Sequence, residues 1–152
     1  MVNSEIIQLI AASANIIIAL IMYKSIREVV KDRKLRFLEK RLDEFYIPLI
    51  KYFGQGGIGV HEKVEEILIS KRHLCGKKVA EILPQHIANT NFEGEFCFTN
   101  KNELKQWEEA ADTIWKEHVE VLKDYYKLIG IKHYTLPEKP KWRFAICRSH
   151  VF

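Results

Sequence analysis

Two groups of residues in this sequence carry side chains that could bind an anion. The first is a run of bases between two predicted helices, and the second is an aromatic residue beside a base near the end of the chain. The members are Arg72, His73, Lys77 and Lys78, followed by Trp142 and Arg143. Cationic side chains pair with phosphate oxygens and an indole stacks on a nucleobase, so these residue types predict a nucleotide-like ligand. The alternative for Trp142 is an aromatic side chain buried at a domain edge.

Other motifs predict no catalytic chemistry. The sequence has no H-E-x-x-H or G-x-S-x-G motif, so we predict no catalytic residue, no cofactor and a protein that is not an enzyme. Gly54–Gly59 reads GQGGIG and matches the dinucleotide pattern, but helical spacing precedes it in place of a strand. It predicts an interhelical turn, with a phosphate held by its backbone N–H groups as the alternative. His73, Cys75, Cys147 and His150 fit no zinc-finger spacing, and no metal is predicted.

Charge distribution and cysteine count bound the class of protein. The 152 residues are 47% hydrophobic and 29% charged, which is typical of a folded protein. All 24 basic residues lie from Lys24 onward beside 19 acids, so that part carries about +5. It favours lipid head groups or nucleotides as partners, and no duplex nucleic acid is expected. Cys75, Cys97 and Cys147 are widely spaced and predict reduced thiols in a cytosolic domain.

The apolar run Ile6–Tyr23 predicts a transmembrane helix. Its eighteen residues carry no charge and span about 27 Å as a helix, close to the hydrocarbon core of about 30 Å. Its small residues lie inside the run and the bases follow it, which disfavours a cleaved signal peptide. The alternative is a buried helix in a soluble core.

Basic residues crowd the C-terminal side of this run. They are Lys24, Arg27, Lys31, Arg33, Lys34, Arg36, Lys40 and Arg41. The positive-inside rule therefore predicts a single-pass protein of the inner cell membrane, with its N-terminus outside and its C-terminal domain in the cytoplasm. We expect residues 24–41 to be mostly a solvated neck that attracts anionic membrane lipid.

Small and polar residues form one stripe along the same helix. The members, spaced 4, 3 and 4 residues apart, are Gln8, Ala12, Asn15 and Ala19. In lipid such stripes pack helices together, and amide side chains hydrogen-bond across the contact. The stripe predicts a homo-oligomer interface, with a pore lining or tolerated polar residues as the alternatives.

The elements that must position these residues are mainly α-helical. We expect a transmembrane helix (1–23), a basic juxtamembrane helix (24–53) and a cytosolic helical domain (54–152). Pro48 predicts a kink or break in the second of these. Within the domain we expect helices over 60–72, 76–85 and 102–129. Residues 92–99 and 141–148 alternate enough to pair as a short β-hairpin.

The longest helix expected in the domain carries a heptad seam. Its members are Leu104, Trp107, Ala111, Ile114, His118, Val121, Tyr125 and Leu128, and Gly130 follows in a C-cap position. The seam predicts packing against the 24–53 helix or a coiled coil between subunits. His118 is expected to be a satisfied core histidine, with a ligand or pH-switch role as the alternative.

Two segments carry a resemblance to known proteins. Residues 38–49 read LEKRLDEFYIPL, which matches L-E-K-x-x-x-x-F-Y-x-P-L, and residues 71–74 read KRHL before a short helix. This combination resembles small prokaryotic single-pass membrane-anchored proteins. The layout is also similar to the membrane effectors of type III CRISPR systems that cyclic oligoadenylates gate. That second resemblance rests on architecture and size, and it implies a nucleotide sensor in antiviral defence without assigning binding residues.

These observations predict a membrane effector. Its cytosolic domain would oligomerise and sense an anionic ligand, for which the resemblance implies a cyclic oligonucleotide. Ligand binding would then perturb the membrane helix. The alternative is a passive tether or assembly subunit that docks a protein partner through the 104–128 seam.

Overall fold

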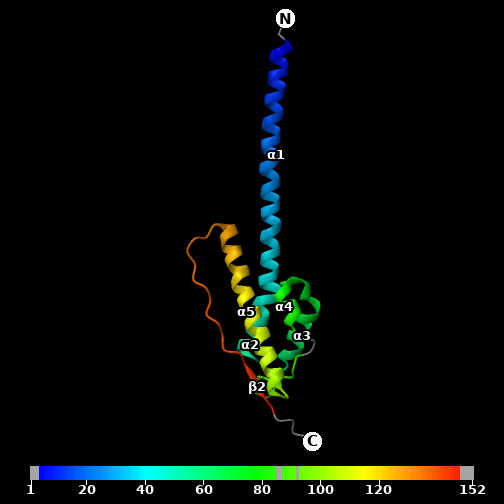
Figure 1. Cartoon of the computed structure of the whole chain (residues 1–152). Coiled ribbons are helices and arrows are strands. Elements are labelled where there is room, and N and C mark those ends of the chain that lie inside the picture. Colours follow the sequence, from blue (N-terminus) through cyan, green and yellow to red (C-terminus); the bar gives the residue numbers. More distant parts are fainter. Residues whose placement is uncertain (1–3, 85–86, 92, 148–152) are drawn as a thin grey trace. The chain divides into compact units, whose positions relative to one another are not determined.

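A computed structural model of the chain describes residues 4–84, 87–91 and 93–147 (Figure 1). The chain forms two compact units, residues 1–36 and residues 37–152. The described residues are mainly helical, as predicted, and the second unit contains one two-stranded sheet. Leu42, Phe45 and Leu49 belong to the core of the second unit, so the boundary expected after residue 53 lies inside that unit.

The described part of the first unit consists of helix α1 (Ser4–Arg41), which ends in the second unit. Its large apolar side chains from Ile6 to Met22 are 51–74% exposed. One 18-residue window has a mean hydropathy of 2.2 and no buried residue. Among the described residues, the continuous helix that starts with α1 and ends at Gln55 is the one that could cross a membrane by length and composition. Exposed apolar surface of this extent is unfavourable in water.

The first helix continues through Pro48 into the second unit. Between α1 and α2 (Ile47–Gln55) lies the π-helical segment η1 (Leu42–Tyr46), where the N–H of Ile47 bonds to the carbonyl of Leu42. Proline lacks the N–H that an α-helix uses, and a wider π turn can accommodate that loss. At the point where a kink or break is predicted, the structure therefore has a π turn.

The predicted helices of the domain are present with shifted ends. They are α3 (Val60–Ser70), the 3-10 turn η2 (Arg72–Leu74), α4 (Lys77–Ile82) and α5 (Lys101–Ile129). The side chain of Asn100 caps α5 by accepting the N–H of Glu103 at 2.9 Å. Gly130 ends α5 in the left-handed conformation, with φ of 82°, as its C-cap position predicts.

The two predicted strand segments do pair, but they form no hairpin. Strand β1 (Phe96–Phe98) and strand β2 (Phe144–Ile146) are parallel, with Phe96 opposite Phe144. Parallel strands need a crossover connection, and here α5 supplies it between them. Alternation along each segment predicted the pairing, but it contains no information on strand direction, so the expected antiparallel hairpin is wrong.

A disulfide bond connects the middle of β1 to the residue that follows β2. Cys97 and Cys147 lie 5.2 Å apart at their Cα atoms, 50 residues apart in sequence, and their sulfur atoms are bonded. The prediction of three reduced thiols is therefore wrong, because strand pairing brings together cysteines that look unrelated in the sequence. Only Cys75 is a free thiol among the described residues.

The seam of α5 packs against the helix formed by the end of α1, η1 and α2. The contacts are Trp107 with Phe53 at 6.0 Å between ring centroids, Glu117 with Tyr46 at 2.6 Å, and Tyr125 with Glu39 at 3.2 Å. The two helices are antiparallel, because the partners move back along the first helix as α5 advances.

The interior of the domain uses most of the seam. Trp107, Ala111, Ile114 and Val121 are buried in the core of their own chain. Of the two predicted modes, packing against the first helix is the one observed. The seam is therefore not a free surface for a protein partner, and the tether alternative loses the docking site assigned to it.

Candidate functional site

The basic group of the sequence gathers on one surface segment, residues 71–78. Arg72 and His73 lie on η2, Lys77 and Lys78 begin α4, and all four side chains are exposed. The guanidinium of Arg72 donates to the carbonyl of Ala80 in α4 at 2.8 Å, which connects η2 to that helix. Lys77 lies 3.8 Å from Glu81, one turn along α4, in a solvent-exposed pair that costs little to break. The segment can therefore offer several cations to an anion.

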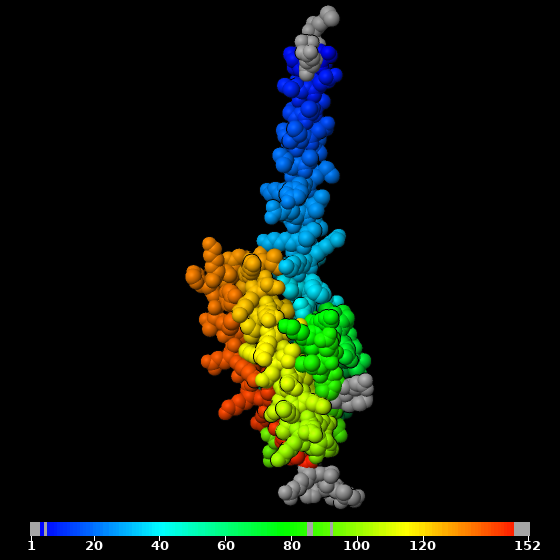
Figure 2. All heavy atoms as spheres, in the orientation of Figure 1, coloured from blue at the N-terminus to red at the C-terminus, as the bar shows by residue number. Residues whose placement is uncertain are grey.

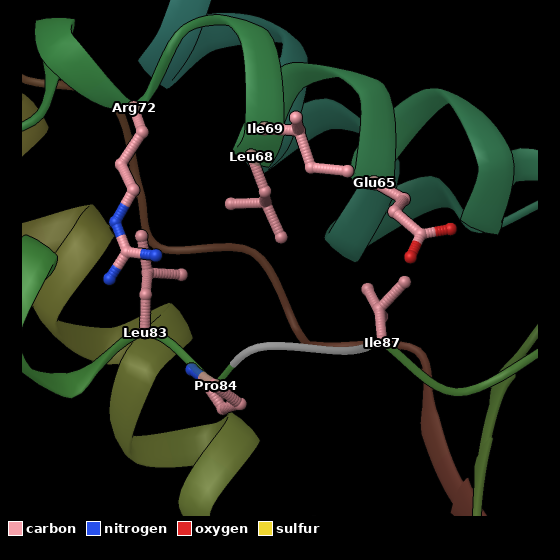
Figure 3. Close-up of a pocket in the computed structure, with 7 residues that line it drawn as sticks. All are labelled: Glu65, Leu68, Ile69, Arg72, Leu83, Pro84 and Ile87. Carbon is pink, nitrogen blue, oxygen red and sulfur yellow. The ribbon is translucent and has the colours of Figure 1, made fainter.

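A small pocket of about 220 Å³ lies beside Arg72 (Figure 3). It lies between α3 and the chain that follows α4, and its walls are mostly apolar. The lining residues are Glu65, Leu68, Ile69, Arg72, Leu83, Pro84 and Ile87. In Figure 3 the Arg72 and Glu65 side chains lie at opposite ends of an apolar floor, so the pocket combines an apolar surface with a cation at its edge.

A polar cluster beneath this segment attaches it to the first helix. Arg41 donates from Nε to the carbonyl of Leu74 at 2.8 Å and from Nη2 to the hydroxyl of Tyr46 at 2.7 Å. The Tyr46 hydroxyl donates to Glu117 Oε2 at 2.6 Å. The N–H of Gly76 lies 3.0 Å from Glu117 Oε2 and 3.2 Å from the Tyr46 oxygen, and it donates to both. We call Arg41, Tyr46, Glu117 and Gly76 the polar clamp.

Burial fixes the protonation states within the polar clamp. Burial, with the hydrogen bond to Glu117, raises the pKa of Tyr46 well above its usual range, so the phenol stays neutral and donates. The Arg41 guanidinium lies 5.4 Å from the centre of the Tyr46 ring and 5.8 Å from that of Phe37. Burial likewise raises the pKa of the Cys75 thiol, which keeps it protonated beside the clamp.

Gly76 is the position where the backbone approaches the clamp most closely. A Cβ atom there would collide with the Glu117 carboxylate. Glycine thus lets the N–H reach Oε2, and a larger residue would displace the carboxylate from Tyr46. Three elements, α1 with η1, the η2–α4 turn and α5, are joined at this point.

A second attachment holds the start of the basic segment. Lys71 donates to Glu44 Oε2 on η1 at 2.8 Å. The hydrogen bond from Lys71 lowers the pKa of Glu44, and electrostatic interactions with Lys40 and His73 add to that effect. The basic segment is therefore connected to residues 41–46 of the first helix at its start, through Lys71, and at its middle, through the backbone of Leu74 and Gly76.

Trp142 and Arg143 belong to a different set of contacts. Trp142 donates from its indole nitrogen to Asp112 at 2.7 Å, and its ring packs against Phe53 and Phe144. Arg143 donates to the carbonyl of Glu93 at 3.0 Å. These contacts agree with the alternative of a half-buried aromatic at the domain edge, and no contact within the described ranges joins this pair to the basic segment.

The glycine-rich turn does not offer its backbone to a phosphate. The N–H groups of Gly56, Gly57 and Gly59 donate to Tyr52, Gly94 and Thr90, in that order. Gly56 has a positive φ of 67°, and a Cβ atom on it would collide with the carbonyl of Gly94. The glycines therefore serve close packing between two loops, and the phosphate-holding alternative is wrong because those donors are already occupied.

His118 is buried, as its seam position predicts, but it is not fully satisfied. It is 6% exposed, and its Nδ1 atom has no hydrogen-bond partner among the described residues. Burial lowers the pKa of its imidazole, which is therefore neutral near pH 7. The zinc alternative fails because Cys147 is in the disulfide; His150 lies outside the described residues.

Sequence reasoning missed the polar clamp. Arg41 was expected in the lipid-facing neck, yet its guanidinium turns into the domain. Tyr46 lies within the F-Y-x-P-L segment, which was the available signal, whereas Glu117 lies beside the seam and carries no pattern of its own. The fold and this site define a class: a small helical domain with a buried polar joint, preceded by an exposed apolar helix.

The chain belongs to a protein family described as "Uncharacterized protein", whose model matches residues 35–146. It is similar to an uncharacterized protein of Archaeoglobus fulgidus, with 34% identity over 139 residues, which is 88% of this chain and 71% of that protein. It is also similar to a solved structure described as the C-terminal domain of a protein of unknown function from the same organism. That match has 37% identity and a TM-score of 0.68, and it covers 74% of this chain and 99% of the other.

Proposed function

We propose that this protein is a single-pass membrane effector whose cytoplasmic domain oligomerises and senses an anionic ligand. The basic segment would bind the ligand, and the polar clamp would pass its effect to the first helix. A cyclic oligonucleotide, as part of antiviral defence, is the ligand that the layout resemblance suggests. No catalytic step is included in this proposal.

The exposed apolar helix supports the membrane attachment. Between Ile6 and Met22 every large apolar side chain is more than half exposed. Isoleucine and leucine each gain about 0.3–0.6 kcal/mol on insertion at the centre of a membrane helix, and this gain offsets the cost of Gln8 and Asn15. The Gln8, Ala12, Asn15 and Ala19 stripe lies on one α-helix, which supports its use for helix packing within an oligomer.

The polar clamp is the observation that carries the sensing proposal. Arg41 contacts the carbonyl of Leu74, and Tyr46 with Glu117 contacts the N–H of Gly76. These two backbone groups lie between Arg72–His73 and Lys77–Lys78, the two halves of the basic segment. A ligand that moves this segment must change the hydrogen bonds of Arg41, and a differential interaction of this kind is what ligand gating requires.

The binding part of the proposal is tested on the full chain in detergent micelles. Cyclic oligoadenylates of different ring sizes are titrated by calorimetry and by the shift in melting temperature. The double change Lys77→Glu with Lys78→Glu should abolish binding, whereas Lys105→Glu with Lys116→Glu on α5 should leave it unchanged. An absence of heat and of any melting shift across the set would remove the nucleotide ligand.

The membrane part is tested by labelling in intact cells. In a Cys75→Ser background, Ser4→Cys should react with a membrane-impermeant maleimide, and Lys63→Cys should react only after lysis. Labelling of both positions in intact cells, or recovery of the chain in the soluble fraction, contradicts the proposed topology.

A further inference from the structure

The end of α5 and the chain that follows it form an exposed surface with an unusual composition. Three apolar or aromatic side chains there, Ile129, Ile131 and Tyr134, are 38–43% exposed. Exposed lysines surround them, and a shallow depression of about 520 Å³ lies among these side chains. Its lining residues are Lys123, Asp124, Lys127, Gly130, Ile131, Lys132 and Tyr134. In Figure 2 this segment, coloured orange, forms part of the outer surface of the domain.

The surface has a fixed shape. Gly130 turns the chain through a left-handed cap, in which the N–H of Ile131 bonds to the carbonyl of Tyr126 at 3.0 Å. The rings of Tyr126 and Tyr134 lie 4.4 Å apart, which holds the following segment against α5. The apolar groups and the lysines are therefore presented together.

Its charge is positive. Asp124 is the one acid that lines the depression, against three lysines, and residues 130–136 contain no acid. His133 adds a titratable group on the same segment. A surface that combines lysines with exposed tyrosine and isoleucine matches the boundary between anionic head groups and acyl chains.

Within the second unit, this surface lies at the same end as the residues with which that unit begins. Because α5 runs antiparallel to the first helix, the contact between Tyr125 and Glu39 precedes the last turn of α5. Only residues 24–36 separate the apolar run from the start of this unit, so a membrane anchor would limit how far its first residues can move from the head groups.

From these observations we infer that the surface formed by Lys123, Lys127, Ile131, Lys132 and Tyr134 binds the anionic lipid surface of the membrane. The inference rests on the proposed membrane attachment. It adds a second contact, from the folded domain itself, to the basic residues 24–40. Lipid bound here would hold α5 in place while the first helix responds to the ligand.

The test uses the full chain, with Cys75→Ser and Lys132→Cys carrying an environment-sensitive dye, in lipid nanodiscs. The discs contain phosphatidylcholine alone or mixed with phosphatidylglycerol. We expect a blue shift and quenching by a lipid-phase quencher in the anionic discs, and neither from a dye at Lys63→Cys on α3. Lys123→Glu with Lys127→Glu should weaken this contact at least about tenfold, because each juxtamembrane lysine contributes about fivefold. Lys105→Glu with Lys116→Glu should leave it intact.

Two readouts separate this inference from the proposed function. Co-elution of the chain with the discs reports membrane attachment, and a chain that does not co-elute overturns both proposals. A chain that co-elutes while the dye at position 132 stays in water overturns the lipid surface alone. An undiminished signal after the double charge reversal overturns it as well, and circular dichroism of that variant shows that its helices are retained.

Discussion

Removing the Tyr46 hydroxyl should destabilise the domain far more than removing that of Tyr125. Each hydroxyl donates to a glutamate on the opposite helix. Tyr46 donates to Glu117 of α5 at 2.6 Å, and Tyr125 of α5 donates to Glu39 of α1 at 3.2 Å. Tyr46 is fully buried, whereas Tyr125 is only partly covered. The pair of variants Tyr46→Phe and Tyr125→Phe therefore compares a buried polar joint with a matched contact near water.

The magnitude follows from the bonds that each hydroxyl makes. The Tyr46 oxygen also accepts from Arg41 at 2.7 Å and from Gly76 at 3.2 Å. Hydrogen bonds to charged groups contribute about 1.5–3 kcal/mol each, but Arg41 and Glu117 retain other partners after the change. We therefore expect Tyr46→Phe to cost about 2–3 kcal/mol. Tyr125→Phe should cost about 0.5 kcal/mol or less, because solvent replaces its single bond.

The assay is thermal unfolding of the full chain in detergent, followed by near-ultraviolet circular dichroism. A unit the size of Phe37–Phe152 loses about 0.24 kcal/mol of stability per kelvin near its Tm. The expected decrease in Tm is then about 10 °C for Tyr46→Phe and about 2 °C for Tyr125→Phe. Equal decreases, or a Tyr46→Phe protein as stable as wild type, would refute the argument. Should Tyr46→Phe fail to fold, Glu117→Gln provides the milder change, since the amide oxygen can still accept from Tyr46.

Three further predictions follow from other contacts. The disulfide between Cys97 and Cys147 closes a loop of 50 residues, which stabilises the chain by about 4 kcal/mol. Reduction or Cys97→Ser should therefore lower Tm by about 15 °C, whereas Cys75→Ser, which removes a free thiol, should change Tm little. Burial lowers the pKa of His118 in the folded chain, so as pH falls the imidazole is protonated in the unfolded chain before it is in the folded one. The free energy of unfolding should therefore decrease as pH falls below about 6.5. In denaturant titrations, a His118→Gln variant should lose this pH dependence. Burial alone would raise the pKa of Asp112, but hydrogen bonds from Lys139 and Trp142 outweigh it and lower that pKa. The ionised carboxylate therefore stabilises the folded chain, and this contribution should be lost as pH falls below about 4. Asp112→Asn should abolish that part of the acid transition.

The sequence predicted elements better than it predicted their long-range partners. Helical periodicity located α3, α4 and α5, and the position of Gly130 after the last seam residue predicted its left-handed cap. Alternation predicted that two strand segments pair, but strand direction depends on the crossover through α5. The disulfide followed from that same pairing, so it could not be predicted before the sheet was known.

The polar clamp escaped prediction for a related reason. Tyr46, Gly76 and Glu117 come from three segments separated by 30 and 41 residues, and no local spacing connects them. Arg41 also looked like its basic neighbours, because the positive-inside rule counts charges without regard to the side of the helix. In the structure Arg41 differs from the basic residues before it because its guanidinium makes two hydrogen bonds inside the domain.

A buried polar joint is a costly way to hold helices together, and this cost bears on its role. Arg41 and Glu117 are partly buried around the buried Tyr46. Replacing charged groups inside a protein by well-packed apolar residues is often neutral or stabilising, so these two charges are not needed for stability alone. What they add is a fixed geometry between the backbone of residues 74–76 and the first helix. A triple change of Arg41→Met, Tyr46→Phe and Glu117→Leu should therefore leave a folded domain that binds the anionic ligand while the membrane helix no longer responds to it. If the response of the membrane helix survives in that variant, the coupling runs through Lys71 and Glu44 instead, the other attachment of the same segment.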